Sequence, residues 1–256
     1  MTPVFNGAKH LEASIESVRA QTYPHIEHIV VDGGSVDDTL HILAQNRDTL
    51  TCWTSERDRG CFDAMNRGIA LATGAIVKVH AADDLMPPRS VEVAVAAFMD
   101  GRAALGDTIV RGHMEVIDAE EQRVRLGGPH SSDATPSILH PTWFVPMPVY
   151  ERLGLYDPSS RVSADYEMYF HALRSGIRFV DLDELLSRFR TGGLSASWGG
   201  LGDTFAINRR YVGLAFATYV AADSTVRGLG KLALTRLFGE RRTANLRSAL
   251  REGFRS

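Results

Sequence analysis

The stretch that decides the fold is Ala75-Ile76-Val77-Lys78-Val79-His80-Ala81-Ala82-Asp83-Asp84. Its first five residues are short, mostly apolar and β-branched, which is typical of a buried strand in an α/β sheet. Two adjacent carboxylates follow where this strand should end, and open α/β sheets bind their ligands at that edge. Carboxylate oxygens there suit Mg²⁺ or Mn²⁺, cations that usually accompany a phosphate. The stretch therefore predicts a divalent-cation site for a nucleoside diphosphate group.

Strand and helix patterns alternate around this stretch through the first hundred residues. β-branched runs predict strands, and apolar residues at helical spacing predict helices. The predicted strands cover 27–32, 50–54 and 75–79. The predicted helices cover 8–21, a segment with Leu40 and Leu43 that Ser35 and Asp38 can cap, 62–74, and Pro87 to Met99. Such alternation is typical of a doubly wound parallel sheet.

The remainder of the chain shows a different pattern. Extended segments that can form a hairpin are predicted over 108–126, a helix over 164–174, short strands over 177–180 and 184–190, and helices over 203–256. We therefore expect an α/β fold with a Rossmann-type mixed sheet flanked by helices, followed by a C-terminal helical extension.

The first strand is expected to be truncated. Pro3-Val4-Phe5-Asn6 has the composition of a strand exit, yet only two residues precede it. A parallel sheet of this type needs that strand in a central position. A stub there would leave backbone groups of the neighbouring strands unpaired.

Charge is distributed unevenly along the 256 residues. The net charge is −3, which argues against a nucleic-acid partner. Residues 226–256 hold eight Lys/Arg and two Glu, a balance of +6, so the rest of the chain carries −9. Two interpretations of this basic segment stay open: it lies on an anionic membrane, or it packs on the acidic body.

The cysteine count and the apolar runs indicate the compartment. Cys52 and Cys61 are too few for a disulfide framework, which favours free thiols in a reducing cytoplasm. No signal peptide opens the chain, and no apolar run is long enough to span a bilayer. We expect a cytoplasmic protein, either free or peripheral at the inner face of the plasma membrane.

Five short motifs occur in order along the first ninety residues. They are Thr2-Pro3-Val4-Phe5-Asn6-Gly7, Val31-Asp32-Gly33-Gly34-Ser35-Val36-Asp37-Asp38-Thr39, Ser55-Glu56-Arg57-Asp58-Arg59-Gly60, Asp63-Ala64-Met65-Asn66-Arg67-Gly68 and Ala82-Asp83-Asp84. Together they resemble a family-2 glycosyltransferase of the GT-A fold. The likeness covers residues 2–90 well and continues more loosely through Asp165 and Gly192-Gly193-Leu194-Ser195. It implies a nucleotide-sugar donor, Mn²⁺ or Mg²⁺, and an inverting single displacement.

The resemblance implies roles for the acidic pair and the nucleotide-binding edge. Asp84 corresponds to the metal-binding carboxylate, and Asp83 would sit beside it near the ribose or the metal. Alanine occupies the first position of this metal motif, so ligation would rest mainly on one carboxylate. The residues implied to contact the base and ribose, or to border them, are Asp32, Glu56, Asp58, Pro3 and Phe5.

The same resemblance implies a base and a closing loop. Asp165 matches the catalytic aspartate at a helix start, where a carboxylate can take the proton of an acceptor hydroxyl. Gly193 belongs to a loop expected to close near the diphosphate, since glycine lets a backbone approach phosphate closely. His140 is open to a structural or an acceptor-site interpretation. Arg59 and Arg67 would either face phosphate or be solvated.

The expected organisation is a GT-A-like domain over 1–200, with a nucleotide-binding half over 1–100 and an acceptor half over 101–200. Residues 201–256 form the basic extension. The expected reaction moves a sugar from a nucleoside diphosphate sugar, with UDP the assumed nucleotide, to a hydroxyl of a saccharide or lipid-linked acceptor. The resemblance implies a place in cell-envelope polysaccharide or glycolipid synthesis.

Three alternatives accompany this interpretation. Asp83-Asp84 could be a surface turn that caps the next helix. The protein could be a sugar nucleotidyltransferase, although such enzymes usually carry a Gly-rich basic loop where this chain has Phe5-Asn6-Gly7-Ala8. It could also be a catalytically inactive homologue of the nucleotide-binding fold that binds nucleotide weakly or not at all.

Overall fold

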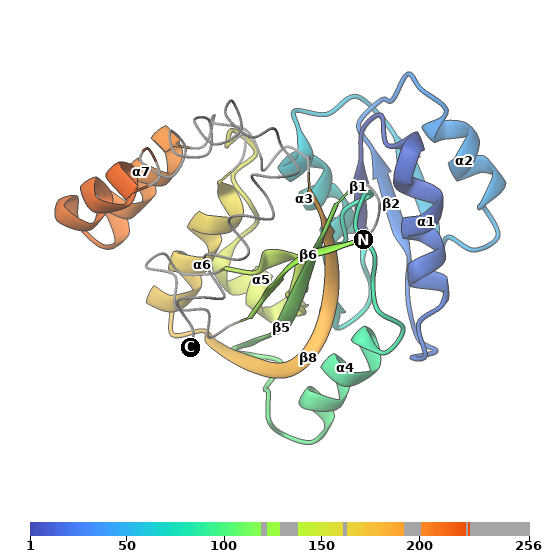
Figure 1. Cartoon of the computed structure of the whole chain (residues 1–256). Coiled ribbons are helices and arrows are strands. Elements are labelled where there is room, and N and C mark those ends of the chain that lie inside the picture. The colour runs from blue at the N-terminus through green and yellow to red at the C-terminus, as the bar shows by residue number, and fades with distance from the viewer. Residues whose placement is uncertain (119–121, 129–137, 161–162, 192–200, 224, 226–256) are drawn as a thin grey trace.

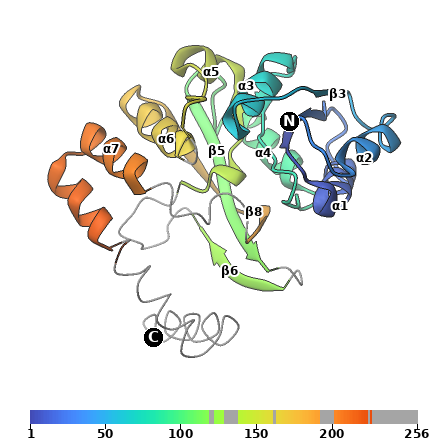
Figure 2. The same cartoon turned by 90° about the horizontal axis from the view of Figure 1, so that it is seen from above.

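A computed structural model describes residues 1–118, 122–128, 138–160, 163–191, 201–223 and 225 of the chain. Strands run through the middle of the molecule, and helices cover them from both sides (Figure 1). α1 (Ala8–Arg19) and α2 (Thr39–Gln45) lie at one end of the molecule, and α7 (Leu201–Tyr211) lies at the other (Figure 1 and Figure 2). The architecture is the expected α/β class.

Three parallel strands form the first sheet, in the order β1 (Thr2–Val4), β2 (Ile29–Asp32), β3 (Cys52–Ser55). Successive side chains of a strand point to opposite faces. Val30 accordingly packs with Leu11 of α1 and Leu43 of α2. Val31 points the other way and packs with Phe62 of α3 (Cys61–Leu71). Helices on both faces confirm the predicted doubly wound arrangement.

β1 is short, as expected, but its neighbours are paired. Its three residues align with Val30, Val31 and Asp32 of β2. On its other side the Met1 ammonium donates to Lys78 O at 2.9 Å, and His80 N donates to Met1 O at 3.0 Å. Burial and the nearby Lys78 lower the pKa of this amino group to about 5.

The remaining strands extend the sheet in mixed directions. They are β4 (Ile76–Val77), β5 (Thr108–Ile117), β6 (Arg123–Gly127), β7 (Val145–Pro146) and β8 (Arg178–Arg190). β4 pairs antiparallel with β7, while β5 lies between antiparallel β6 and parallel β8. Two hydrogen bonds between Val110 and Phe144, at 3.1 and 2.8 Å, connect these groups. The hairpin predicted over 108–126 is present as β5 and β6.

Helices surround this part of the sheet as well. They are α4 (Ser90–Met99), α5 (Met147–Leu153), α6 (Ala164–Arg174) and α7, with one 3₁₀ turn, η1 (His140–Thr142). α6 has the predicted bounds, whereas α5 was not predicted. Residues 214–223 are also helical, and the basic segment 226–256 lies outside the described residues. Within the part of the chain that the structure describes, no helix combines the length and apolarity needed to cross a membrane.

Several predicted elements had other bounds than expected, and three of the differences have clear causes. β4 ends at Val77, because the next residues bond to Met1 instead. α4 begins at Ser90, because Pro88 O accepts from Thr22 N at 2.9 Å and holds the two prolines in a turn. The two strands predicted near 177–190 are one, β8. Asp181 in its polar middle pairs with Arg111 of β5 at 2.6 Å, so the strand continues.

Candidate active site

Asp32 ends β2 and organises the loop that follows it. Its carboxylate accepts from Gly34 N at 3.1 Å, Ser35 N at 3.0 Å and Ser55 Oγ at 2.7 Å. The Ser35 hydroxyl is a fourth donor, so Ser35 does not cap the next helix. With 0% of its surface exposed, Asp32 holds the loop against β3. Its predicted contact with the nucleotide stays a prediction.

Glu56 and Asp58 lie beside this loop, at the end of β3. Glu56 N donates to Asp32 O at 3.0 Å, while its carboxylate is 79% exposed. The Asp58 carboxylate packs against Gly33 so closely that a Cβ there would come within 2.5 Å of Asp58 Oδ2. A larger residue at position 33 would therefore displace the Asp58 carboxylate. The structure brings Asp32, Glu56 and Asp58 to one edge of the sheet.

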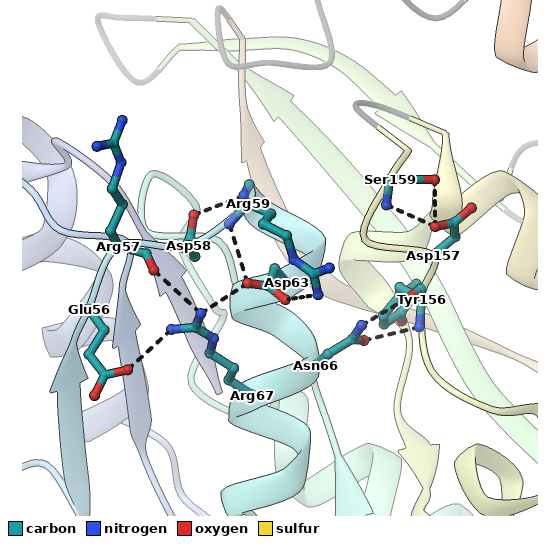
Figure 3. A network of polar contacts seen from close by, with 11 residues as sticks. Glu56, Arg57, Asp58, Arg59, Asp63, Asn66, Arg67, Tyr156, Asp157 and Ser159 are labelled. Atoms are coloured by element: carbon teal, nitrogen blue, oxygen red, sulfur yellow. Dashed lines mark hydrogen bonds and ion pairs between the residues drawn. The ribbon is translucent and has the colours of Figure 1, made fainter.

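Ion pairs from α3 hold the Glu56 loop in place (Figure 3). The half-exposed guanidinium of Arg67 lies 3.6 Å from Glu56 and 3.1 Å from Asp63. Arg59 also pairs with Asp63, at 2.9 Å. These contacts, with the Arg59 hydrogen bond first among them, lower the pKa of Asp63. Both arginines are thus neutralised within the network, which favours a structural role over a free phosphate-binding one.

Phe5 stands at the same edge, immediately after β1. It is 63% exposed, so its ring is accessible to a ligand at this edge. Asn6 follows with φ of 50°, and its backbone N–H donates to Ser35 Oγ at 2.7 Å. Pro3 is buried inside β1. Of the two residues predicted to border the base, only Phe5 therefore presents its side chain at the surface.

The acidic pair follows the β4 segment, as predicted, and is not a helix cap. Asp84 is 1% exposed, and α4 begins only at Ser90. Asp84 Oδ1 accepts from Arg190 N at 3.1 Å, and Arg190 Nε donates to Asp83 O at 3.0 Å. Burial, then the Asp83 charge, raises the pKa of Asp84 to about 7. The end of β8 thus holds the pair in place.

A divalent cation fits the chemistry of this pair. A buried carboxylate next to a second carboxylate is costly to ionise, and a bound cation removes that cost. Among the described residues, no group of three or more His, Cys, Asp or Glu side chains surrounds one point. An incomplete set of protein oxygens suits Mg²⁺ or Mn²⁺, which keep positions for phosphate and water. Asp84, with Asp83 beside it, is the donor set this chain offers.

Asp165 lies in the first turn of α6 and is partly buried. Within the described part of the chain, its carboxylate accepts a hydrogen bond from Tyr166 N at 2.8 Å. Burial raises the pKa of Asp165 to about 6. After burial, the charges of Asp165 and Asp58 raise the pKa of the Cys61 thiol to about 11. The predicted base and a predicted donor-side carboxylate therefore lie near the same thiol, at the start of α3.

A row of buried groups connects the acidic pair to Asp165. Lys78 lies near enough to Asp84 to lower the pKa of that carboxyl. Burial and then Lys78 lower the pKa of His140 to about 3. His140 Nε2 hydrogen-bonds Tyr156 Oη at 2.7 Å, and the Asp165 charge contributes to raising the pKa of Tyr156. The neutral, buried His140 favours the structural interpretation, and the acidic pair and Asp165 lie at opposite ends of this row.

Sequence reasoning missed several residues that build this site. Arg190 and Tyr156 had no local signal, because their partners lie about a hundred residues away in the chain. Asn66 belongs to one of the five sequence motifs, but the motif predicts no role for its side chain. Gly193, predicted to close over the diphosphate, lies outside the described residues.

A parallel sheet with carboxylates at its strand ends and helices on both faces is the architecture of a GT-A-like fold. The sequence model described as Glycosyl transferase family 2 matches residues 1–151, and the chain belongs to that family. An uncharacterised glycosyltransferase of Mycobacterium tuberculosis is 32% identical over 223 residues, 82% of this chain and 84% of that protein. One of Rickettsia typhi is 30% identical over 198 residues, 72% of this chain; the match spans 61% of that protein.

Solved structures share the fold at low identity. S. aureus TarS 1–349 in complex with UDP-GlcNAc superposes with a TM-score of 0.65 at 16% identity, covering 93% of this chain and 75% of the TarS 1–349 chain. The mannosyltransferase PcManGT of Pyrobaculum calidifontis, in complex with GDP-Man and Mn²⁺, gives 0.58 at 19% identity, covering 97% and 77%. Family membership does not support the sugar nucleotidyltransferase alternative.

Proposed function

We propose that this chain transfers a sugar from a nucleoside diphosphate sugar to an acceptor hydroxyl, with inversion at the transferred carbon. The observation that carries the proposal is the placement of Asp165. It is a partly buried carboxylate close to Cys61, which lies in the first turn of the helix that also holds the donor-side loop. Complexes of fold neighbours with UDP-GlcNAc and with GDP-Man support a nucleotide-sugar donor. We take UDP as the nucleotide.

Asp165 acts as the general base. A pKa of about 6 leaves the carboxylate ionised at neutral pH, yet basic enough to accept a proton in the transition state. The acceptor oxygen attacks the sugar carbon as its proton passes to Asp165, and the diphosphate departs on the opposite side. Inversion follows from this single displacement.

The donor lies along the edge formed by β1–β3. The exposed Phe5 ring borders the base, and Glu56 and Asp58 contact the ribose side. Asp32 shapes the loop below them, and Gly193 approaches the diphosphate. Asp84 and Asp83 hold Mn²⁺ or Mg²⁺, which offsets the charge of the departing diphosphate when bound.

The acceptor is a saccharide or a lipid-linked sugar in cell-envelope synthesis. A Mycobacterium bovis relative, 32% identical over 175 residues, carries the name PGL/p-HBAD biosynthesis glycosyltransferase, which supports this class. Residues 226–256, with their balance of +6, bring the 1–200 domain to the anionic inner face of the plasma membrane. No nucleic acid takes part.

A donor screen tests the proposal. Purified protein is incubated with UDP-, GDP- and dTDP-sugars and Mn²⁺, and sugar-nucleotide turnover is followed. We expect turnover with one donor and its loss in both Asp84→Ala and Asp165→Asn. Only Asp84→Ala should also abolish the metal-dependent rise in Tm with the free nucleotide. If no nucleotide raises Tm, the inactive-homologue alternative holds.

A further inference from the structure

Three side chains on one face of α3 point to two different parts of the molecule. Asp63 and Arg67 hold the Glu56 loop on the donor side. Asn66 lies between them in sequence and turns toward Tyr156 (Figure 3). Side chains three and four residues apart share a helix face. α3 therefore touches both the donor loop and the segment that leads to Asp165.

Asn66 binds the backbone of Tyr156 with both ends of its amide. Nδ2 donates to Tyr156 O at 2.7 Å, and Oδ1 accepts from Tyr156 N at 3.0 Å. The side chain thus pairs with both backbone groups of one residue, as a neighbouring strand would. Both polar groups of Tyr156 are satisfied by one residue 90 positions away. Alanine at position 66 would leave both without a partner.

Tyr156 is fixed at its ring as well. The ring stacks on Phe62 of α3 with centroids 5.7 Å apart. Its hydroxyl hydrogen-bonds His140 Nε2 at 2.7 Å and Tyr150 Oη at 3.1 Å. The side chain is buried, so it has one available orientation. Through Tyr156, α3 contacts the acceptor half.

Hydrogen bonds between described residues lie on both sides of residues 161–162, between Tyr156 and the start of α6. Asp157 Oδ1 accepts from Ser159 N and Oγ, both at 2.8 Å. Ser160 Oγ accepts from Ser163 N at 3.2 Å, and α6 begins at the next residue. The charge of Asp165 in turn contributes to raising the pKa of Tyr156, so the two side chains are close. A displacement of Tyr156 therefore changes the environment of the Asp165 carboxylate.

We propose that Asn66 is a positioning residue, which sets Asp165 relative to the donor through its two hydrogen bonds to Tyr156. This inference rests on the proposed function, since it needs a donor edge and a base. Asn66 touches no reacting atom. Its effect is on the distance between two groups that must act together, and small misplacements of this kind reduce turnover strongly.

Variants of Asn66 test the inference against a merely structural role. Asn66→Ala removes both hydrogen bonds, and Asn66→Asp keeps the shape but faces Tyr156 O with an acceptor. Asn46→Ala is the control, because Asn46 also donates twice, to Glu12 at 2.9 Å and Ile42 O at 3.0 Å, on the far side of the first sheet.

We expect kcat to fall 10- to 100-fold in both Asn66 variants. The Kd for UDP–Mn²⁺ should stay within two-fold of the parent, and the acid limb of the pH–kcat profile should shift. Asn46→Ala should leave all three unchanged. Unchanged kcat in a folded Asn66 variant, or equal losses in kcat and nucleotide affinity, would overturn the inference.

Hydrogen exchange on the parent protein decides the question even if the variants do not fold. We expect UDP–Mn²⁺ to slow amide exchange in 55–67 and also in 154–160, because Asn66 joins them. In Asn66→Ala only the first segment should respond. UDP binding that leaves 154–160 of the parent unchanged overturns the inference alone. If the parent binds no nucleotide at all, the proposed function fails and the inference fails with it.

Discussion

The end of β2 and the start of α6 each carry an aspartate, in different circumstances. Asp32 is fully buried, accepts four hydrogen bonds and supports the loop around it. Asp165 is partly buried and, among the described residues, accepts a hydrogen bond from Tyr166 N, while burial raises its pKa. A carboxylate with four donors stabilises the loop around it, whereas a carboxylate that is costly to ionise is typical of functional sites. We therefore expect Asp32 to act through the fold and Asp165 through the chemistry.

The largest expected effect is on turnover by Asp165→Asn. The amide cannot take the acceptor proton, so kcat should fall by about 10²–10⁴-fold, the usual contribution of a general base. Nucleotide affinity should hardly change, because the residue lies on the acceptor side. Initial rates with saturating donor, and titration calorimetry with UDP–Mn²⁺, measure the two quantities. A variant that keeps more than a tenth of the parent rate would remove Asp165 from the mechanism.

Asp32→Ala should damage the fold rather than the chemistry. It leaves two backbone N–H groups and two hydroxyls without their acceptor, which we expect to lower the free energy of unfolding by about 3 kcal/mol or more. Asp38→Ala is the control, since exposed Asp38 makes no side-chain hydrogen bond to cap α2. It should change stability by less than about 0.5 kcal/mol. Urea denaturation of both variants measures the free energy of unfolding. Equal losses of stability in Asp32→Ala and Asp38→Ala would contradict the structural role of Asp32.

Asp165→Asn should also make the protein more stable, in a pH-dependent way. The folded pKa of Asp165, about 6, lies above the unfolded value of 3.8, so the folded state binds more protons between these values. The stability of the parent therefore falls as pH rises from about 4 to 6. Asparagine does not ionise, so the variant should gain about 1–3 kcal/mol at pH 8 and almost nothing at pH 4. A gain independent of pH would show that ionisation is not its source.

Local patterns predicted much of this fold. The first hundred residues alternate clearly, and α6 has its predicted bounds because its polar start and apolar spacing are local signals. The bounds of α4 and β8 depend on distant partners, Thr22 and Arg111, which no local pattern contains. The same limit applies to the site. The acidic pair was visible at a strand end, whereas the bond between Asn66 and Tyr156 joins residues 90 positions apart.

The smallest expected effect on stability concerns Glu56, the exposed counterpart of Asp32 and Asp165. Its ion pair with Arg67 is 3.6 Å long and open to solvent, so Glu56→Gln should change the free energy of unfolding by less than about 0.5 kcal/mol. If Glu56 contacts the nucleotide as proposed, UDP affinity should nevertheless fall by about 10- to 100-fold, the value of one charge-assisted hydrogen bond. Glu16→Gln breaks a comparable surface pair, with Arg19 at 2.6 Å, and should leave affinity unchanged. Calorimetry on both variants makes the comparison. If Glu56→Gln and Glu16→Gln bind UDP with equal affinity, Glu56 stabilises its loop, as Asp32 does, and does not contact the nucleotide.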